Sequence, residues 1–318
     1  MKLALGTLHS DKEFVAELRS EFPTVEFRPS TSDEEEQANI RDADAFWGNP
    51  SRELLQAAER LRWLQSVGTG VENIVSIPEV RESDVILTNC RGPHAEPMAD
   101  HVFGMVTTLA HKLNEMWDDQ REHRWETAKY NDRHDNLYGS TMGILALGDI
   151  GKAIARRAHG FGMTVNAVDR YPKRWAPIVS EVWELDRLDE LLSISDWFVI
   201  AAPLTPETRG LVDRRRVALI KEGAYVIVIS RGNIMDEDAL IDGLRSGRIA
   251  GAGLDVTAVE PLPDSSPLWD MKNVLLSPHA SAMTPTQWSE RLAVMKENLR
   301  RHLAGEPFLH VVDKTAGF

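Results

Sequence analysis

The sequence predicts an α/β protein built from two parallel-sheet domains, and three observations support this prediction. The chain has 318 residues, enough for two domains that each bury a core of their own. Short apolar runs alternate with helical stretches along most of that length. A glycine turn stands between one apolar run and a helix, an arrangement that belongs to parallel α/β sheets.

Before residue 97 the apolar runs are short, and turn residues separate them. Ser51, followed by Glu53, is a typical helix start. We expect strands at 2–8, 43–49, 62–70 and 84–90, and helices at 13–22 and 51–61. From Pro97 onward apolar residues recur at helical spacing, which predicts one long helix reaching about Trp117 and bridging the domains.

From Met142 the alternation returns and predicts a second parallel sheet of about six strands. The expected strands are 142–147, 164–169, 196–203, 224–230, 250–256 and 273–279. Between them lie helical stretches or turns at 152–161, 188–194, 214–220 and 236–247, and a terminal helix follows at 284–305.

Residues 118–140 differ from both regions because they are polar, mix aromatic with charged side chains and show no clean period. Irregular runs of this length are uncommon in compact domains, so we expect an arm or loop that packs on something else. Its histidines and aspartates, among them His123 and His134, lack a recognised ligand spacing, and we expect no metal site.

Composition excludes several classes of protein. The chain carries 36 Lys and Arg against 49 Asp and Glu, a formal net charge of −13, which repels nucleic acid and anionic membranes. No apolar run approaches the ~20 residues of a membrane span, and no signal-peptide core follows the first methionine. The single cysteine, Cys90, fits a reducing compartment, so we expect a cytoplasmic protein.

The glycine turn lies at 146–151, between an apolar run and a helix. Gly148, Asp149, Ile150 and Gly151 stand where backbone N–H groups at a helix N-terminus can hold a pyrophosphate. The first glycine of the dinucleotide fingerprint is replaced by Ala146, which we expect to need a negative φ there.

A carboxylate follows the next expected strand. Asp169 stands 169 − 151 = 18 residues after the last glycine, close to the ~20 expected for the group that binds the adenosine ribose. Its negative charge repels a 2′-phosphate, which favours NAD over NADP. The neighbouring Arg170, Lys173 and Arg174 soften that preference, so NADP is not excluded.

After this turn, several segments resemble the D-isomer-specific 2-hydroxyacid dehydrogenase family, and the similarity covers nearly the whole chain. They are APLTPETRGLV at 202–212, ISRGNIMDEDAL at 229–240, GAGLDV at 251–256, EPLP at 260–263 and LLSPHAS at 275–281. The resemblance implies a Rossmann-type cofactor domain at 99–282 inserted into a flavodoxin-like substrate domain formed by 1–98 and 283–318. It implies an active site between the two domains, with a catalytic set of Arg231, Glu260 and His279.

The chemistry of a 2-oxo acid suits these three residue types. A guanidinium can fork onto a carboxylate and polarise the neighbouring carbonyl, which suits Arg231 at the end of an apolar run. Hydride addition leaves an oxyanion that needs a proton, and histidine is the side chain suited to donate it near neutral pH. Glu260 would fix the ring of His279 and favour its charged form.

Other roles follow from the same resemblance. The turn of Thr69 and Gly70 would bind the substrate carboxylate, while Trp47 either walls the substrate pocket or belongs to the core. Met98 either approaches the nicotinamide or fills the core, and Cys90 is expected to be a buried small residue. The remaining cofactor contacts would come from Arg170, Pro203, Thr208, Ser230 and Asp255.

We therefore expect an oxidoreductase that moves a hydride between NAD(H) and a small 2-oxo or D-2-hydroxy acid. Two alternatives stay open: a nucleotide-responsive binding protein on the same fold, and an enzyme like formate dehydrogenase. The arm at 118–140 makes a homodimer the expected assembly, again through the resemblance. The sequence does not identify which 2-hydroxy acid is used.

Overall fold

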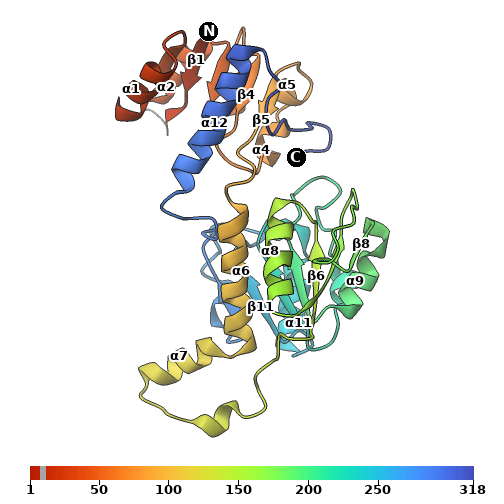
Figure 1. Ribbon diagram of the computed structural model, residues 1–318. Coiled ribbons are helices and arrows are strands. Elements are labelled where there is room, and N and C mark those ends of the chain that lie inside the picture. Colours follow the sequence, from red (N-terminus) through yellow and green to blue (C-terminus); the bar gives the residue numbers. More distant parts are fainter. Residues whose placement is uncertain (8–11) are drawn as a thin grey trace. The chain divides into compact units, whose positions relative to one another are not determined.

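The computed structural model describes residues 1–7 and 12–318 and divides the chain into two compact units (Figure 1). Unit 1 comprises Met1–Pro93 and Pro285–Phe318, and unit 2 comprises His94–Thr284. The expected strand at 2–8 ends at Leu5, and its last residue, Leu8, lies outside the described residues.

Unit 1 contains an all-parallel five-stranded sheet in the order β2-β1-β3-β4-β5. Its strands are β1 (Lys2–Leu5), β2 (Glu26–Pro29), β3 (Ala45–Trp47), β4 (Trp63–Gln65) and β5 (Ile86–Thr88). Its helices are α1 (Lys12–Glu21), α2 (Asp33–Ile40), α3 (Arg52–Gln56), α4 (Glu72–Val75), α5 (Pro78–Arg81) and α12 (Gln287–Ala304). Alternate strand residues enter different cores: Leu3 and Leu5 pack under α1 and α12, whereas Ala4 packs under α2 to α5.

Four elements of unit 1 escaped the sequence prediction: β2, α2 and the four-residue helices α4 and α5. β2 and α2 both lack an apolar period. β2 is a four-residue edge strand that ends in proline, which suits an edge because proline cannot donate to a further strand. α2 begins with four acidic residues and buries only Ile40. It is stabilised at its start instead, where Ser32 accepts a hydrogen bond from the Glu35 amide and the acidic turn matches the helix dipole.

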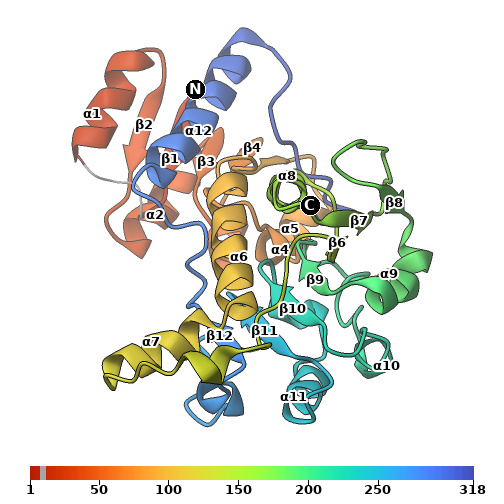
Figure 2. The same ribbon diagram turned by 60° about the horizontal axis from the view of Figure 1, so that its bottom comes forward.

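Unit 2 contains an all-parallel seven-stranded sheet in the order β12-β11-β10-β9-β6-β7-β8 (Figure 2). Its strands are β6 (Thr141–Leu145), β7 (Thr164–Val168), β8 (Glu181–Trp183), β9 (Trp197–Ile200), β10 (Tyr225–Val228), β11 (Gly251–Leu254) and β12 (Val274–Leu276). The expected number was about six. The strand that the sequence prediction missed is β8, a three-residue edge strand with an exposed first residue.

Helices cover both faces of this sheet. The core on one face gathers side chains of α6 (Ala95–Ala110) and α8 (Asp149–Gly160). The core on the other face gathers side chains of α9 (Leu188–Ile194), α10 (Arg214–Val217) and α11 (Glu237–Arg245). None of the helices among residues 1–7 and 12–318 combines the length and apolar character needed to cross a membrane.

The predicted long helix is wrong in one respect, because it breaks into α6 and α7 (Leu113–Arg121). Lys112 lies between them in the left-handed region, with φ of 55°. Its ammonium group donates to the Leu109 carbonyl at 3.0 Å and to the Tyr225 hydroxyl at 2.6 Å. The sequence analysis missed this break because no glycine or proline lies there and the helical spacing of apolar residues continues across it.

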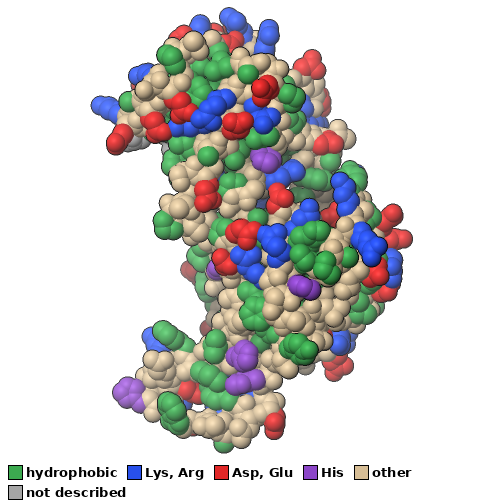
Figure 3. Space-filling model, viewed as in Figure 1, with side chains coloured by type: hydrophobic (Ala, Val, Ile, Leu, Met, Phe, Trp, Pro, Cys, Tyr) green, Lys and Arg blue, Asp and Glu red, His purple; other side chains and the backbone are tan. Residues whose placement is uncertain are grey.

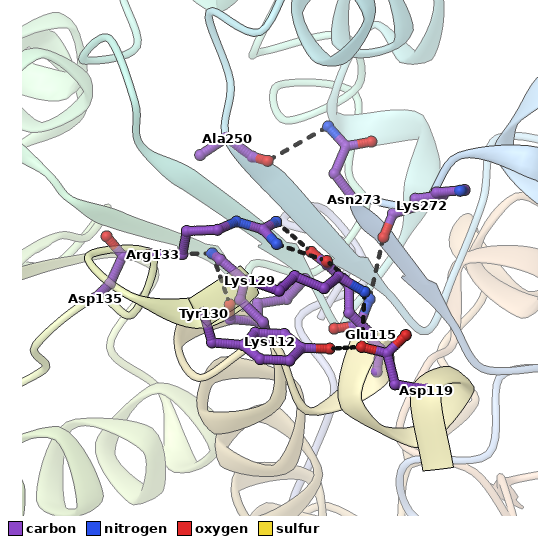
Figure 4. Close-up of polar contacts among 12 residues, drawn as sticks. Lys112, Glu115, Asp119, Lys129, Tyr130, Arg133, Asp135, Ala250, Lys272 and Asn273 are labelled. Carbon is purple, nitrogen blue, oxygen red and sulfur yellow. Dashed lines mark hydrogen bonds and ion pairs between the residues drawn. The ribbon is translucent and has the colours of Figure 1, made fainter. Parts of the chain in front are cut away.

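The segment expected to be an irregular arm has internal order, including the end of α7 and the short helix η2 (Thr127–Tyr130). Its centre is the buried carboxylate of Asp119, which accepts hydrogen bonds from Arg124 at 2.6 Å, Lys129 at 2.8 Å and Tyr130 at 2.5 Å. Figure 4 shows the Tyr130 hydroxyl directed at the Asp119 carboxylate. These donors, Lys129 first, hold the pKa of Asp119 well below its usual range. The arm at 118–140 is therefore tied together by its own polar residues.

Candidate active site

The glycine turn joins β6 to α8, and its backbone is unusual. Ala146 has a φ of 75°, so the expected negative φ is wrong. The Ala146 amide donates to the Val168 carbonyl at 2.8 Å, and the next amide, of Leu147, donates to the Asp169 carboxylate at 2.7 Å. These two bonds hold an alanine where glycine is normally favoured.

Gly148 and Gly151 serve different needs at this turn. A Cβ on Gly151 would lie 2.2 Å from the Ala146 carbonyl oxygen, so the helix can start here only with glycine. A Cβ on Gly148 would meet nothing within 4 Å. Gly148 is exposed and is the N-cap of α8, and Asp149 and Ile150 form the first turn, whose amides can face an anion.

Asp169, one residue after β7, has a structural task in the same turn. One carboxylate oxygen accepts from Leu147, and the other accepts from the Tyr171 amide at 2.8 Å. The neighbouring Arg170 forms an ion pair with Glu207 at 2.8 Å. A negative charge therefore stands beside the glycine turn, and the nearest arginine in sequence is already engaged.

The loop after β9 is closed by Thr208, whose hydroxyl donates to the Pro203 carbonyl at 2.7 Å. Ser230 and Arg231 follow β10, the next strand in the sheet. The Ser230 hydroxyl donates to the Ile200 carbonyl at 3.2 Å, and Arg231 donates to the Ser230 carbonyl at 2.7 Å. These predicted residues thus lie on loops that leave neighbouring strands at their carboxyl ends.

Arg231 is followed by Gly232, which has no room for a side chain. A Cβ there would lie 2.1 Å from the carbonyl carbon of Thr257. Glu260 belongs to the loop that Thr257 begins, and its carboxylate accepts from the Thr257 amide at 3.2 Å. The loop that carries Arg231 therefore packs directly on the loop that carries Glu260.

Glu260 and His279 meet although they lie on different loops. Nδ1 of His279 is 2.8 Å from the Glu260 carboxylate, and the two side chains are 49% and 39% exposed. The contact leaves Nε2 of His279 as the ring nitrogen available to another group. His279 has a φ of 53°, which is uncommon for a residue other than glycine.

Asp255, which follows β11, is buried, and its carboxylate faces the loop that carries His279. It accepts hydrogen bonds from the Ser277 hydroxyl at 2.6 Å and from the Ala280 amide at 2.9 Å. Ser277 also contacts His101 of α6, with Nε2 of His101 2.8 Å from the Ser277 hydroxyl oxygen. The sequence analysis did not identify either residue as part of the site. No local pattern connects two residues 176 positions apart.

The expected substrate residues of unit 1 lie near β4 and β5. Thr69 is held by two hydrogen bonds: its hydroxyl donates to the Cys90 carbonyl at 3.1 Å, and its carbonyl accepts from Asn89 at 2.8 Å. Gly70 follows it in an exposed position. Cys90 itself is buried, and burial raises the pKa of its thiol to about 12.

The suggestion that Trp47 walls the substrate pocket is wrong. Its side chain is fully buried in the core of unit 1, with its ring 6.2 Å from that of Trp63. Because Trp47 ends a central strand of the sheet, both faces around it are covered. Met98, a residue of α6, is buried in a core of unit 2.

Within the two described ranges, no group of three or more His, Cys, Asp or Glu side chains could hold a metal ion. What the site offers is a guanidinium, a histidine paired with a carboxylate, and a glycine turn at a helix N-terminus. This set can bind a nucleotide pyrophosphate, orient a small carboxylate and transfer a proton.

Comparison with known proteins gives the same family that the motifs indicated. Residues 103–281 match the family model described as "D-isomer specific 2-hydroxyacid dehydrogenase, NAD binding domain". The chain is 36% identical over 261 residues to glyoxylate/hydroxypyruvate reductase B of Pectobacterium carotovorum, with 81% of each chain covered.

It is also 30% identical over 316 residues to D-3-phosphoglycerate dehydrogenase of Methanocaldococcus jannaschii, covering 98% of this chain and 59% of the relative. The chain spans about half the length of the phosphoglycerate dehydrogenases that it matches, between 47% and 59%. Among solved structures, a D-isomer specific 2-hydroxyacid dehydrogenase from Xanthobacter autotrophicus, in complex with NADPH and MES, is 31% identical. Its TM-score is 0.85, with 100% of this chain and 99% of that chain covered.

Proposed function

Because this chain belongs to the D-isomer specific 2-hydroxyacid dehydrogenase family, we propose that it is an oxidoreductase acting on a small 2-oxo acid or D-2-hydroxy acid. The reaction moves a hydride between the substrate carbon and a nicotinamide dinucleotide. The observation that supports the proposal most strongly is the 2.8 Å contact between His279 and Glu260, because this pair is suited to proton transfer.

The residues of the glycine turn fit a dinucleotide. Gly151 allows α8 to start against the Ala146 carbonyl, and Gly148 leaves open space in front of the helix N-terminus. The amides of Asp149 and Ile150 would bind the pyrophosphate, and the loops at Pro203, Thr208 and Ser230 would line the rest of the nucleotide. When bound, the nicotinamide supplies or accepts the hydride.

NAD(H) is the preferred cofactor in this proposal. The Asp169 carboxylate would face the adenosine ribose and repel a 2′-phosphate. Arg170, the residue best placed in sequence to bind that phosphate, is engaged by Glu207 at 2.8 Å. A relative of similar fold binds NADPH, so the ratio of kcat/KM for NADH and NADPH decides this point.

Arg231 would hold the substrate. Its guanidinium can donate two parallel hydrogen bonds to a carboxylate and can polarise the carbonyl next to it. The turn of Thr69 and Gly70 in unit 1 is the other group that we propose for binding a substrate carboxylate, through its backbone N–H groups. Loss of Arg231 should therefore affect substrate turnover far more than nucleotide binding.

His279 would donate the proton in the reductive direction. The Glu260 carboxylate accepts a hydrogen bond from Nδ1 of His279, which fixes the orientation of the ring. Nε2 then donates a proton to the carbonyl oxygen as that oxygen gains negative charge. In the oxidative direction the neutral ring accepts the hydroxyl proton, so one residue serves both directions.

A second copy of this chain is the proposed partner. Trp125, on the arm at 118–140, is 95% exposed, and Trp117, on α7 just before the arm, is 61% exposed; large apolar side chains are costly to leave in water. Figure 3 shows apolar and histidine side chains over the segment that follows α6. Sedimentation equilibrium should give the mass of two chains.

The cytoplasmic location expected from the single cysteine stays a prediction.

The experiment that tests the function is oxidation of NADH with a panel of glyoxylate, hydroxypyruvate, pyruvate and phenylpyruvate. Formate with NAD serves as the control for the formate dehydrogenase alternative. We expect turnover with at least one 2-oxo acid and none with formate. Binding of NADH without any turnover would favour a nucleotide-responsive binding protein and contradict the proposal.

A further inference from the structure

A buried carboxylate stands beneath the loop that carries His279 and has no Lys or Arg partner among the described residues. Asp255 is 1% exposed, and its nearest ion-pair candidate is Nε2 of His101, at 3.9 Å. A charge removed from water needs several hydrogen-bond donors to be stable there. Asp255 obtains them from the 277–281 turn and, through Ser277, from α6.

Three donors meet this carboxylate. One oxygen accepts from the Ser277 hydroxyl at 2.6 Å and from the Ala280 amide at 2.9 Å. The other accepts from the Ser281 amide at 3.2 Å. The Asp255 main-chain carbonyl also accepts from the His279 amide at 2.8 Å. One residue therefore binds the backbone of His279 and of both residues that follow it.

The direction of the next hydrogen bond follows from the chemistry of a hydroxyl. Ser277 has one hydroxyl proton, and an ionised carboxylate can only accept, so Ser277 donates to Asp255. The 2.8 Å contact between Ser277 and Nε2 of His101 must then run the other way. His101 donates from Nε2, and the chain of hydrogen bonds passes from His101 to Ser277 to Asp255.

The three residue types are those of a hydrolytic triad, but their order is different. In such a triad the histidine accepts the serine proton and the carboxylate binds the histidine. Here the carboxylate accepts from the serine, and the histidine donates to that serine. This arrangement cannot activate the serine as a nucleophile, so its role is to hold structure.

The hydrogen bonds of Asp255 hold the backbone of His279 and of the two residues that follow it. His279 has a φ of 53°, a conformation that costs free energy for a residue with a Cβ and is therefore helped by contacts that hold the backbone. Glu260 fixes the ring of His279 through Nδ1, but it does not fix the backbone. The backbone is fixed by Asp255, from both its carbonyl and its carboxylate.

The packing of α6 brings His101 within reach. Met105 lies one helical turn after His101, on the same side of α6. A Cβ on Gly253 of β11 would lie 2.7 Å from the Met105 sulfur and 3.0 Å from its Cβ. Glycine at this position lets the helix approach the sheet closely, which sets how far His101 reaches toward the end of β12.

We propose that His101 and Ser277 are positioning residues that, through Asp255, hold His279 in its strained conformation for proton transfer. This inference rests on the proposed role of His279 as proton donor. We assign neither residue a contact with the reacting atoms. Their removal loosens the 279–281 backbone, misplaces Nε2 of His279 and lowers kcat, while NADH still binds at the glycine turn.

The test compares Ser277→Ala with Ser277→Thr, which keeps the hydroxyl. A third variant, His101→Phe, removes the other hydrogen bond in the series from His101 through Ser277 to Asp255. Ser195→Ala is the matched control, because Ser195 is also buried in unit 2 and donates only to the Leu191 carbonyl, at 2.6 Å. Three quantities are measured: kcat and KM for the 2-oxo acid, the dissociation constant of NADH, and hydrogen exchange of the amides at 279–281.

We expect kcat to fall about 10-fold or more in Ser277→Ala and His101→Phe, with exchange at 279–281 faster by a similar factor. NADH affinity should change by less than about threefold. Ser277→Thr should recover most of both losses, and Ser195→Ala should leave both quantities near wild type.

The inference would be overturned if Ser277→Ala kept the wild-type kcat and the wild-type hydrogen-exchange rates at 279–281. It would also be overturned if Ser195→Ala lost as much kcat as Ser277→Ala. The exchange measurement does not depend on turnover. If the wild type reduced no 2-oxo acid, the proposed function would fail, while protected amides at 279–281 that open in Ser277→Ala would still establish the backbone clamp.

Discussion

Three glycines around α8 allow the cofactor site to be tested separately from the fold. A Cβ on Gly151 would lie 2.2 Å from the Ala146 carbonyl oxygen, a backbone atom that cannot move without opening the turn. We expect Gly151→Ala to destabilise unit 2 by about 1–3 kcal/mol, in the range of overpacked sites. At about 2–4 °C for each kcal/mol, the melting temperature should drop by several degrees. NADH affinity should be lost with the turn.

Gly148→Ala should separate the two effects. Its Cβ would meet no atom within 4 Å, so stability should fall by less than about 1 kcal/mol, the part due to alanine being a poorer N-cap than glycine. A pyrophosphate close to this backbone would nonetheless clash with the methyl group. Loss of one hydrogen bond to a charged group weakens binding by about 10-fold or more.

Gly160→Ala is the control, because Gly160 is the last residue of the same helix and its Cβ would also meet nothing within 4 Å. It should be neutral or slightly stabilising and should bind NADH normally. Calorimetric melting and NADH fluorescence titration measure both quantities. Wild-type NADH affinity in Gly148→Ala would refute a pyrophosphate at this turn, and wild-type stability in Gly151→Ala would refute the packing argument.

Three further predictions concern single side chains. Asp169→Ala should narrow the preference for NADH over NADPH. It should also weaken the binding of both cofactors, because the Asp169 carboxylate holds the Leu147 amide in the glycine turn. Steady-state kinetics with each cofactor measure both effects, and unchanged kinetics with NADH would contradict the prediction. Cys90 should resist iodoacetamide at pH 8 in the native protein and react after unfolding, since burial raises the pKa of its thiol to about 12; rapid native labelling would be the opposite result. Because its hydrogen bonds lower the pKa of Asp119, they stabilise the arm fully above the ordinary carboxyl pKa of about 4, and this stabilisation declines as pH falls from there toward the lowered pKa. Asp119→Asn should therefore loosen the arm at neutral pH, as reported by the fluorescence of Trp117 and Trp125, and an unchanged spectrum would argue against this.

The strands that could be predicted from the sequence are those formed by an apolar run. Arg231 and His279 each follow such a run, so their place at the carboxyl ends of β10 and β12 was visible in advance. β2, β8 and α2 were not, because short edge strands and an acidic helix carry no apolar period. Their stability comes from strand pairing and capping, which a periodic pattern does not record.

Features that depend on tertiary contacts were also out of reach. The left-handed φ of Ala146 is imposed by the Val168 carbonyl and the Asp169 carboxylate, which are distant in sequence. The burial of Trp47 depends on the strands on either side of it. The link between His101 and Ser277 joins a helix to a loop across 176 positions. One sequence shows each of these residues but not the partner that fixes it.

The central claim is that His279 transfers the proton, and the pH dependence of kcat/KM in both directions tests it most directly. Reduction needs the protonated ring and oxidation needs the neutral ring, so reduction should fall and oxidation should rise as pH increases through one common window. His279→Ala should lose about 10²–10⁴-fold in activity and lose this inflection, with NADH affinity retained. A variant within a few-fold of wild type, or one that keeps the original inflection in both directions, would contradict the claim and assign the proton to another group.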